Sequence, residues 1–581
     1  MQTSHHDFHR DPQKRPKVFN FNMLFQSRLP KPSLPDSTVY HYLLHQGRRD
    51  YPRDRILYRQ DGSDRTLTLA ELEEQSTALA KVLIGLYSIQ PGDVVAIFAS
   101  DTIHFPVAYM AMLAAGATVS LIPVQQNISP ENIADRLSQS QARLLFTDEL
   151  LLSTVHTFLA NNPDFPLILL DEASAKYPCL VDLLKQCETS TPLFHFQGVD
   201  EANKHIAFIN STSGSTGKMK SVLTSHSHFT STMEGTRATI PTNTDPDADT
   251  WVSTLSLGYY ICAKLFMGLN ILLGIPVVLL NRPLGNDDES LSVIERHKLT
   301  FLFIAPPVAA EIAKADTAKH DLTSIKWLLS AGAPMHDKLR ESISQQLNNQ
   351  HLTLEWGTTE TMLLAIQIDE QSSIPGSSGT LVNGIEAKVI DTETGAELGP
   401  GQEGEILVRN SCSPYAGYRD NDEANKAFDA DGFFHTGDIG FLDSTCNVFI
   451  KDRMQELLRV GNGYGSRISA SELESVLFDH PAVAMAVVVG VRDEVTQIFH
   501  PTAFVVLASG CTAGYDMERE LVEYSERQLT GLKRLTGGVY FLRDYPKIGF
   551  KIDRKKLKTL VQIASGQATR EAINGFVALA A

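Results

Sequence analysis

The chain has 581 residues, roughly four times the size of an ordinary domain, so we expect more than one domain. Hydrophobic residues make up 43% and charged residues 20%, a balance typical of soluble globular proteins rather than of disordered or fibrous ones. The net charge of −17 argues against a nucleic acid as partner, because phosphate backbones bind basic surfaces. Six scattered cysteines without a CxxC pair predict reduced thiols, no zinc site and a cytoplasmic location.

The ends of the chain and its apolar runs predict neither a targeting signal nor a membrane span. Residues 1–35 are rich in His, Arg, Lys and Pro and have no apolar core, so we expect a polar tail there. The runs 94–124 and 265–280 are interrupted by polar residues or too short for a span, which needs about 20 apolar residues. Residues 566–581 are expected to form a second tail without a peroxisomal signal.

Strand and helix patterns alternate through the first half of the chain. A strand followed by an amphipathic helix is predicted over 66–86, and Ser129-Pro130-Glu131 supplies the cap, proline and acid that open another helix. Buried strands are predicted at 94–98, 118–122, 143–147, 167–170, 276–280 and 300–304. Strands separated by helices favour parallel sheets that are covered on both faces.

The pattern changes after about residue 375. Strands predicted at 385–390 and 405–409, joined by a glycine-rich connection, indicate a small β-rich subdomain. From residue 451 a compact α+β pattern is predicted, with helices at 469–479 and 517–532 and strands at 482–489 and 502–507. The fold class is therefore α/β, with four segments: tail 1–35, a large N-terminal domain 36–452 of layered, parallel-rich sheets, a smaller C-terminal domain 453–565, and tail 566–581.

The segment STSGSTGKMK, residues 211–220, directly follows an apolar strand pattern. Its glycines let the backbone turn its N–H groups inward, and its hydroxyls with Lys218 or Lys220 add further donors and positive charge. Such a cluster suits a polyphosphate, although the same loop taken alone is compatible with a solvated turn. Gly214 and Gly217 stand too close together for a Walker A loop.

Four later segments carry chemistry when they are considered together. SAGAP, residues 330–334, has small residues that would let a flat ring lie on the backbone; an ordinary turn is the alternative. EWGTTET, residues 355–361, could stack a base, bond a phosphate and hold Mg²⁺, or form a loop around a packed tryptophan. Asp438 at the end of HTGD could accept hydrogen bonds from both ribose hydroxyls or cap a turn. The basic segment 546–554 could also be a solvated charge run.

In this order the segments resemble the adenylate-forming superfamily of acyl-CoA synthetases, luciferases and adenylation domains. The resemblance covers roughly residues 40–565 and is nearest to the 4-coumarate–CoA ligase and luciferase branch. It implies a two-step reaction in which a carboxylic acid and ATP give an acyl-adenylate and pyrophosphate, and a thiol then displaces AMP. Implied partners are ATP, Mg²⁺, a small carboxylic acid and coenzyme A as co-substrate, with a C-terminal domain that moves between the steps.

The resemblance also implies roles for individual residues. Lys551 would bridge the carboxylate and α-phosphate oxygens, Thr359 would bond the α-phosphate, and Glu360 would bind Mg²⁺. Gln455 would stand at the hinge. The implied ATP- and AMP-binding residues are Thr212, Ser213, Gly214, Ser215, Thr216, Gly217, Lys218, Lys220, Gly332, Ala333, Pro334, Trp356, Gly357, Thr358, Asp438 and Arg453.

Within that set, three residues have more specific implied contacts. Trp356, where the family usually has tyrosine, would stack on adenine, and Asp438 with Arg453 would hold the ribose. The expected acyl pocket is lined by Tyr259, Tyr260, Met362 and Leu363, which are also ordinary core residues. Residues 256–262 lack the acid of amino-acid-activating domains, so an aryl or medium-chain acid is expected.

Several departures from the family pattern leave two alternatives open. Met219 and Ser221 replace a proline and a glycine, Phe550 replaces a glycine, and 459–467 is longer than the corresponding thiolation segment. The leading interpretation is a stand-alone acyl- or aryl-CoA ligase. The first alternative is an adenylating enzyme that passes the acyl group to a carrier protein or an amine, and the second is a degenerate nucleotide-binding protein without catalysis.

Overall fold

The structure, a computed structural model, describes most of the chain. The described residues are 23–125, 128–170, 176–186, 191–213, 219–282, 284, 287–313, 315–347, 351–460, 467–529, 533–548, 551–561, 563–564 and 567–568. Among them, no helix combines the length and the hydrophobicity that crossing a membrane requires.

A six-stranded sheet forms the first layer of the large N-terminal part, in the order β7-β6-β4-β5-β8-β9. Its strands are β4 (Val94–Ile97), β5 (Thr118–Leu121), β6 (Ala142–Thr147), β7 (Leu167–Leu169), β8 (Ile206–Ser213) and β9 (Met219–Ser225). All neighbours run parallel except β8 and β9, which form an antiparallel pair. The predicted strands of this region are therefore confirmed, with shifts of a residue or two at their ends.

Helices cover both faces of this sheet, as alternate residues of β4 show. Val95 and Ile97 belong to the cluster that includes α2 (Leu69–Gly85) and α3 (His104–Ala114), whereas Ala96 belongs to the cluster under α4 (Pro130–Ser140) and α5 (Leu152–Asn161). Successive side chains of a strand point to opposite faces, so a fully covered strand is apolar throughout. This explains why β4 has no polar alternation.

Helix starts follow their sequence signals. The Ser129 side chain accepts a hydrogen bond from the backbone N–H of Asn132, and Pro130 takes the first helical position of α4. At α2, Thr68 and Glu71 form a reciprocal capping box. Each cap satisfies backbone donors that the first helical turn leaves unpaired.

A nine-stranded sheet forms the second layer, in the order β16-β15-β14-β13-β12-β10-β11-β2-β3. Its strands are β2 (Ile56–Gln60), β3 (Thr66–Thr68), β10 (Trp251–Val252), β11 (Val277–Leu279), β12 (Phe301–Phe303), β13 (Trp327–Ser330), β14 (Leu352–Trp356), β15 (Ala365–Ile366) and β16 (Thr380–Leu381). The six central strands are parallel and the edges antiparallel. Helices α8 (His226–Arg237), α9 (Tyr260–Lys264), α11 (Asp288–His297), α12 (Pro306–Ile312) and α13 (Asp337–Gln346) belong to the same part of the chain.

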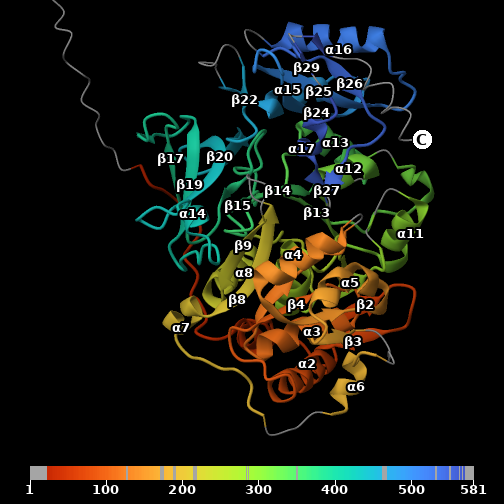
Figure 1. Cartoon of the computed structure of the whole chain (residues 1–581), viewed down its shortest axis with the longest axis vertical. Coiled ribbons are helices and arrows are strands. Elements are labelled where there is room, and N and C mark those ends of the chain that lie inside the picture. The colour runs from red at the N-terminus through yellow and green to blue at the C-terminus, as the bar shows by residue number, and fades with distance from the viewer. Residues whose placement is uncertain are drawn as a thin grey trace, which may run out of the picture.

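A third sheet, mainly antiparallel, lies to one side and is drawn in teal in Figure 1, apart from its N-terminal strand in red. Its order is β1-β17-β19-β20-β21, with β18 paired to β17. The strands are β1 (Phe25–Gln26), β17 (Ile385–Ile390), β18 (Glu397–Leu398), β19 (Gly404–Asn410), β20 (Phe434–Leu442) and β21 (Val448–Arg453). This sheet is the predicted β-rich subdomain.

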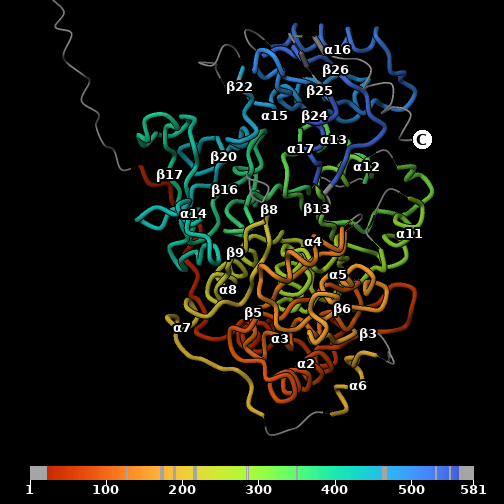
Figure 2. The backbone as a smooth tube through the Cα atoms, in the orientation of Figure 1, coloured from red at the N-terminus to blue at the C-terminus, as the bar shows by residue number. Residues whose placement is uncertain are grey.

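The C-terminal α+β part lies at one end of the molecule and is blue in Figures 1 and 2. It contains a sheet of β24 (Val483–Arg492), β25 (Phe499–Leu507) and β26 (Val539–Phe541) with α15 (Ala470–Phe478) and α16 (Tyr515–Gln528). A hairpin of β27 (Lys547–Ile548) and β28 (Lys551–Ile552) precedes α17 (Arg554–Lys558).

Short elements complete the described chain. They are α1 (Val39–His41), a π-helical turn η1 (Tyr42–Gln46), η2 (Glu149–Leu151), α6 (Leu180–Leu184), α7 (Val199–Lys204), η3 (Leu265–Leu269), α10 (Asn270–Leu273), η4 (Thr317–Lys319), α14 (Asp422–Asn425), β22 (Leu458–Arg459), β23 (Arg467–Ile468), β29 (Ile563–Ala564) and β30 (Gln567–Ala568).

The C-terminal part contacts the helices that follow β12 and β13. The Lys338 ammonium donates to the backbone oxygen of Phe478 over 2.8 Å, and the His336 ring lies 4.6 Å from the Phe478 ring. Lys547 forms an ion pair with Glu311 at 2.8 Å. These contacts hold α15 and the β27–β28 hairpin of the C-terminal part against the N-terminal part.

Candidate functional site

The Asp438 carboxylate is the centre of the candidate site, and both of its oxygens have a donor. The Trp356 indole N–H donates to Oδ2 over 2.8 Å, and Arg453 Nε lies 2.7 Å from Oδ1. The pairing of β20 with β21 sets Arg453 directly opposite Asp438. Burial raises the pKa of Asp438, while Arg453 and the indole lower it.

The loop after β14 is a tight turn that presents two candidate residues. Met362 N–H donates to Thr358 O over 2.8 Å, and Thr358 N–H donates to Thr361 Oγ1 over 3.2 Å. A Cβ on Gly357 would lie 1.7 Å from the Met362 oxygen, so only glycine fits there. Thr359 and Glu360 at the tip are half-buried and remain accessible to a ligand.

Tyr418 holds the Glu360 carboxylate, and the sequence did not indicate this contact. The Tyr418 hydroxyl donates to Glu360 Oε1 over 2.6 Å from a loop that follows β19. Burial and the Glu360 charge raise the pKa of Tyr418, so the phenol keeps its proton and acts as a donor. The two residues are 58 positions apart, and no local pattern links them.

Lys551 faces the same group of charges from the C-terminal part. Its side chain is partly exposed, yet desolvation by the surrounding protein is the largest cause that lowers its pKa. Arg453 lowers that pKa further, whereas Glu360 and Asp438 raise it. The β27–β28 hairpin therefore brings Lys551 within electrostatic reach of three predicted site residues. Phe550, one of the departures noted in the sequence, lies outside the described residues.

The β8–β9 hairpin carries the described residues of the predicted phosphate loop. Thr212 pairs with Lys220 and Ser213 with Met219 across the two strands. The Lys220 ammonium lies 5.2 Å from the centre of the Tyr418 ring. The predicted residues Gly214, Ser215, Thr216, Gly217 and Lys218 lie outside the described residues, as does most of segment 459–467.

Gly332, Ala333 and Pro334 are exposed in the loop after β13. β13 and β14 are parallel neighbours, so this loop and the loop with Thr359 leave the sheet at the same edge. Gly332 has φ of +89°, a conformation that favours glycine. Gln455, the predicted hinge, lies exposed in the turn directly after β21.

The residues predicted for the acyl pocket lie in one apolar cluster. Met362 and Leu363 are buried with Trp356, and Tyr259 and Tyr260 pack against that cluster. The Tyr260 ring lies 5.5 Å from that of Phe208. These contacts are compatible with a pocket wall and with a structural core.

A buried ion pair beside this cluster was missed by the sequence analysis. Lys264 Nζ lies 2.6 and 2.5 Å from the oxygens of Glu355, and both side chains are almost fully buried. Desolvation lowers the pKa of Lys264, while Glu355 raises it. A lysine inside the apolar run 260–273 was the available signal, since a buried charge needs a partner. The pair joins α9 to β14 just before Trp356.

The described residues fit a Mg²⁺ ion that is held mainly by phosphates. They contain no group of three or more His, Cys, Asp or Glu side chains arranged for a metal. Mg²⁺ at nucleotide sites is usually held by one or two carboxylates, substrate phosphates and water. The half-buried Glu360 would supply one such carboxylate.

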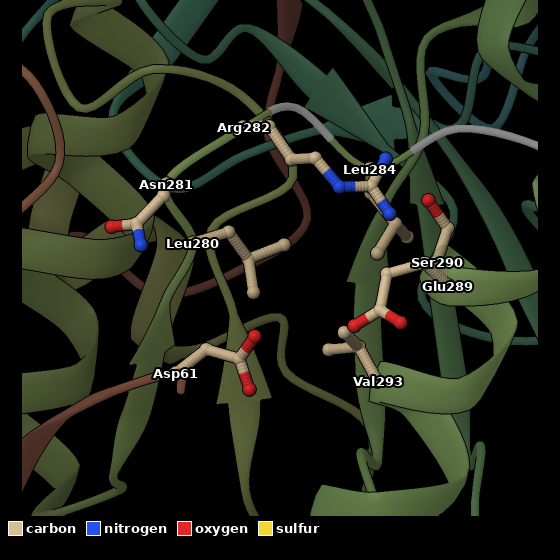
Figure 3. Close-up of a pocket in the computed structure, with 8 residues that line it drawn as sticks. All are labelled: Asp61, Leu280, Asn281, Arg282, Leu284, Glu289, Ser290 and Val293. Carbon is tan, nitrogen blue, oxygen red and sulfur yellow. The ribbon is translucent and has the colours of Figure 1, made fainter. Parts of the chain in front are cut away.

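A separate cavity of about 240 Å³ lies at the start of α11 and is shown in Figure 3. Asp61, Arg282 and Glu289 are among its lining residues. The charges there are already paired, Arg282 with Asp287 and Arg296 with Asp61. Its described lining includes none of the predicted site residues, so it is a less suitable candidate than the Asp438 site.

Known proteins are similar to this chain over most of its length. The profile of the family described as AMP-binding enzyme matches residues 44–418, and that of the AMP-binding enzyme C-terminal domain matches 472–549. The chain is 29% identical over 556 residues to 4-coumarate–CoA ligase 5 of Oryza sativa subsp. japonica, covering 94% of this chain and 98% of the relative. It is 30% identical over 514 residues to luciferin 4-monooxygenase of Nipponoluciola cruciata, covering 85% and 89%.

Solved structures share the fold. The anthranilate CoA ligase AuaEII in complex with anthranoyl-AMP superposes with a TM-score of 0.79 at 21% identity, covering 91% of this chain and 97% of the other. A benzoate CoA ligase from Burkholderia xenovorans LB400 gives a TM-score of 0.75 at 22% identity, covering 90% and 99%. The predicted fold class and resemblance are confirmed, whereas the domain boundaries and the roles of single residues stay predictions.

The Lys264–Glu355 pair predicts a large difference between single and double substitutions. Lys264→Ala leaves the buried Glu355 carboxylate without its partner and is expected to lower the free energy of unfolding by about 3–5 kcal/mol. Replacing both partners by apolar residues, Lys264→Met with Glu355→Leu, is expected to restore most of that loss. Urea-induced unfolding measures both values. A double variant as unstable as Lys264→Ala would contradict this account of the pair.

Proposed function

The chain belongs to the AMP-binding enzyme family, and from that premise we propose that it is an AMP-forming acid–thiol ligase that uses ATP and coenzyme A. The observation that carries the proposal is the convergence of Asp438, Glu360 and Lys551, which come from three separate segments of the chain. Retention of these charged groups is unexpected in a degenerate nucleotide-binding protein.

In the proposed first step, a carboxylate oxygen of the acid attacks the α-phosphorus of ATP. The new P–O bond gives an acyl-adenylate as the bond to the β-phosphate oxygen breaks and pyrophosphate leaves. Lys551 would donate hydrogen bonds to the carboxylate and the α-phosphate, and Thr359 would bond the α-phosphate. Glu360 would hold Mg²⁺, which would neutralise charge on the phosphate oxygens. Fixed donors aimed at developing negative charge lower such barriers by several kcal/mol.

The nucleotide is held, in this proposal, by groups that are already ordered. Asp438 has a donor on each oxygen and further lone pairs for the ribose hydroxyls. Trp356 offers its ring to adenine, and Lys220 with Thr212 offers donors to the outer phosphates. Because the Trp356 indole is hydrogen-bonded to Asp438, the proposed contacts with the base and with the ribose are coupled to each other.

In the proposed second step, the thiol of coenzyme A attacks the carbonyl carbon of the acyl-adenylate, AMP leaves and the thiol proton passes to solvent. The C-terminal part turns about Gln455 between the steps. Such a turn must break the contacts of Lys338 with Phe478 and of Lys547 with Glu311. Water can replace these two polar contacts at small cost, whereas the packing of the His336 ring on the Phe478 ring would be lost as well.

We infer that the acid is an aryl or medium-chain carboxylic acid. The residues assigned to the acyl wall are tyrosines and aliphatic side chains. Lys264, four residues after Tyr260 on the same helix, is paired with Glu355, so these two buried charges neutralise each other. Relatives and structural neighbours include ligases of 4-coumarate, benzoate and anthranilate by name, which supports the aryl option.

ATP–pyrophosphate exchange against pools of aryl, short-, medium- and long-chain acids in Mg²⁺ tests the proposal. Exchange with one pool is expected, and adding coenzyme A should then give a thioester. Exchange without a thioester would instead favour transfer to a carrier protein or an amine. ATP binding without exchange for any acid would favour a nucleotide-binding protein without catalysis.

Lys551→Ala is expected to lower adenylation by at least about a hundredfold, the usual loss when one charge-stabilising donor is removed. The variant should still convert a synthetic acyl-adenylate and coenzyme A to the thioester, because Lys551 acts only in the first step. Single-turnover assays of the two half-reactions measure this split. Lys555→Ala, which removes an exposed lysine of α17, is the matched control. Equal loss of both half-reactions would overturn the assignment.

Asp438→Asn tests the ribose contact while keeping the size of the side chain. Loss of the charged acceptor is expected to weaken ATP binding about tenfold or more. The comparison with 3′-deoxy-ATP makes the test specific. The unsubstituted protein should bind 3′-deoxy-ATP more weakly than ATP, whereas Asp438→Asn should discriminate much less. Calorimetry with both nucleotides measures this, and unchanged discrimination would place the ribose elsewhere.

A further inference from the structure

Tyr418 lies between the two opposite charges that we place at the phosphates of ATP. Its hydroxyl donates to Glu360 Oε1 over 2.6 Å, and the Lys220 ammonium lies 5.2 Å from the centre of its ring. We propose that Tyr418 is a positioning residue that fixes the Glu360 carboxylate beside Lys220 and thereby sets the affinity of the site for metal-bound nucleotide. This inference rests on the proposed role of Glu360 as the metal ligand.

The Tyr418 ring is itself held firmly against β9. Leu223 N–H donates to Gly417 O, and Arg419 N–H donates to Ser221 O, both over 2.9 Å. Val222 and Tyr418 form an isolated antiparallel bridge between these two bonds. The segment thus pairs with the strand that carries Lys220. Only 6% of the Tyr418 residue is exposed, and its ring packs with Val222 in a small apolar cluster.

The Tyr418 hydroxyl fixes Oε1 of the Glu360 carboxylate and leaves Oε2 available to a metal ion. Hydrogen bonds from a hydroxyl to a carboxylate are short and strong, and this one is within that range. Within the described part of the chain, Oε2 accepts no hydrogen bond. A carboxylate on a turn would otherwise rotate freely, so the bond reduces the entropy that metal binding must remove.

Tyr418 also accounts for the separation of two charges that could neutralise each other. Lys220 and Glu360 form no ion pair with any described residue. The tyrosine supplies each with a different partner, its ring face for the ammonium and its hydroxyl for the carboxylate. The cation and the anion therefore both remain available to a metal–triphosphate ligand, which needs the two charges side by side.

Tyr418→Phe removes only the hydroxyl and tests the proposal directly. Mn²⁺ serves as the probe, and its binding to the protein–ATP complex is followed by electron paramagnetic resonance of the free ion. Loss of a hydrogen bond to a charged group is expected to weaken Mn²⁺ binding about tenfold. The Mg²⁺ concentration for half-maximal exchange should rise by a similar factor, and excess Mg²⁺ should restore the rate.

Tyr415→Phe is the matched control in the same loop. The Tyr415 hydroxyl is buried and has no hydrogen-bond partner among the residues that the structure describes. This variant should leave Mn²⁺ binding within about twofold of the parent, because it breaks no bond. Thermal unfolding of both variants separates a local effect from loss of the fold. If both variants weaken Mn²⁺ binding equally, the loss comes from a general disturbance of the loop rather than from the Tyr418 hydrogen bond, and the proposal fails.

A double substitution tests whether Tyr418 affects Mn²⁺ binding through Glu360. In a Glu360→Ala background, Tyr418→Phe should cause no further loss of Mn²⁺ binding, since the acceptor is already gone. A further loss as large as in the parent protein would overturn the positioning role. If Tyr418→Phe is too unstable to assay, Glu360→Asp supplies the second route. Withdrawing the carboxylate from the hydroxyl should then give the same roughly tenfold loss, and unchanged Mn²⁺ binding would overturn the proposal.

The binding assay separates this inference from the proposed ligase activity. It needs ATP and Mn²⁺ but no acid, so a protein that binds both and exchanges no pyrophosphate still tests Tyr418. A parent protein that binds no nucleotide would overturn both the ligase proposal and the role of Tyr418. Normal Mn²⁺ binding by Tyr418→Phe in an active ligase would overturn the role of Tyr418 alone.

Discussion

The hydrogen bond between Trp356 and Asp438 joins two sheets of the molecule at the candidate site. Trp356 ends β14 of the nine-stranded sheet, and Asp438 lies on β20 of the mainly antiparallel sheet. A carboxylate that is only 2% exposed needs donors to remain ionised, and Trp356 and Arg453 supply them. Since Arg453 ends β21, the same carboxylate also fixes the last strand before the turn that holds Gln455. The proposed adenine wall, the proposed ribose acceptor and the start of the C-terminal part therefore depend on one buried group.

The site collects positive charge locally in a chain whose net charge is −17. Desolvation is the largest cause that lowers the pKa of Lys551; repulsion by Arg453 lowers it further, and Glu360 and Asp438 offset part of both effects. A bound phosphate between the two cations would offset the remainder. Nucleotide binding is thus expected to favour the arrangement in which Lys551 faces the site, because the ligand interacts with charges from both parts of the chain.

Local patterns in the sequence were enough for the strands, the capped helices and the order of the parts. Buried strands such as β4 are apolar throughout, and Ser129-Pro130 marks the start of α4, because these features depend on neighbours in the chain. Motif resemblance brought Asp438, Arg453, Glu360 and Lys551 to attention, and the fold brings these four together. Tyr418 and the Lys264–Glu355 pair could not be found in that way. Their contacts span 58 and 91 positions, so only the tertiary structure determines them.

The contacts of the site differ in burial and in the free energy that is needed to break them. This difference agrees with the proposed two-step chemistry. The Asp438 contact with Trp356 is buried, and breaking it would leave polar groups unsatisfied at a cost of about 1–3 kcal/mol, whereas the Tyr418 contact with Glu360 is part-buried. The Lys547–Glu311 pair beside Lys551 is partly exposed, with 29% and 40% of its side chains accessible, and such pairs contribute about 1 kcal/mol or less. In the proposed reaction, the contacts of Asp438 can therefore stay in place while the hairpin with Lys551 moves away. The proposed thiol step requires that movement, because the hairpin lies against the charges that we propose to surround the adenylate.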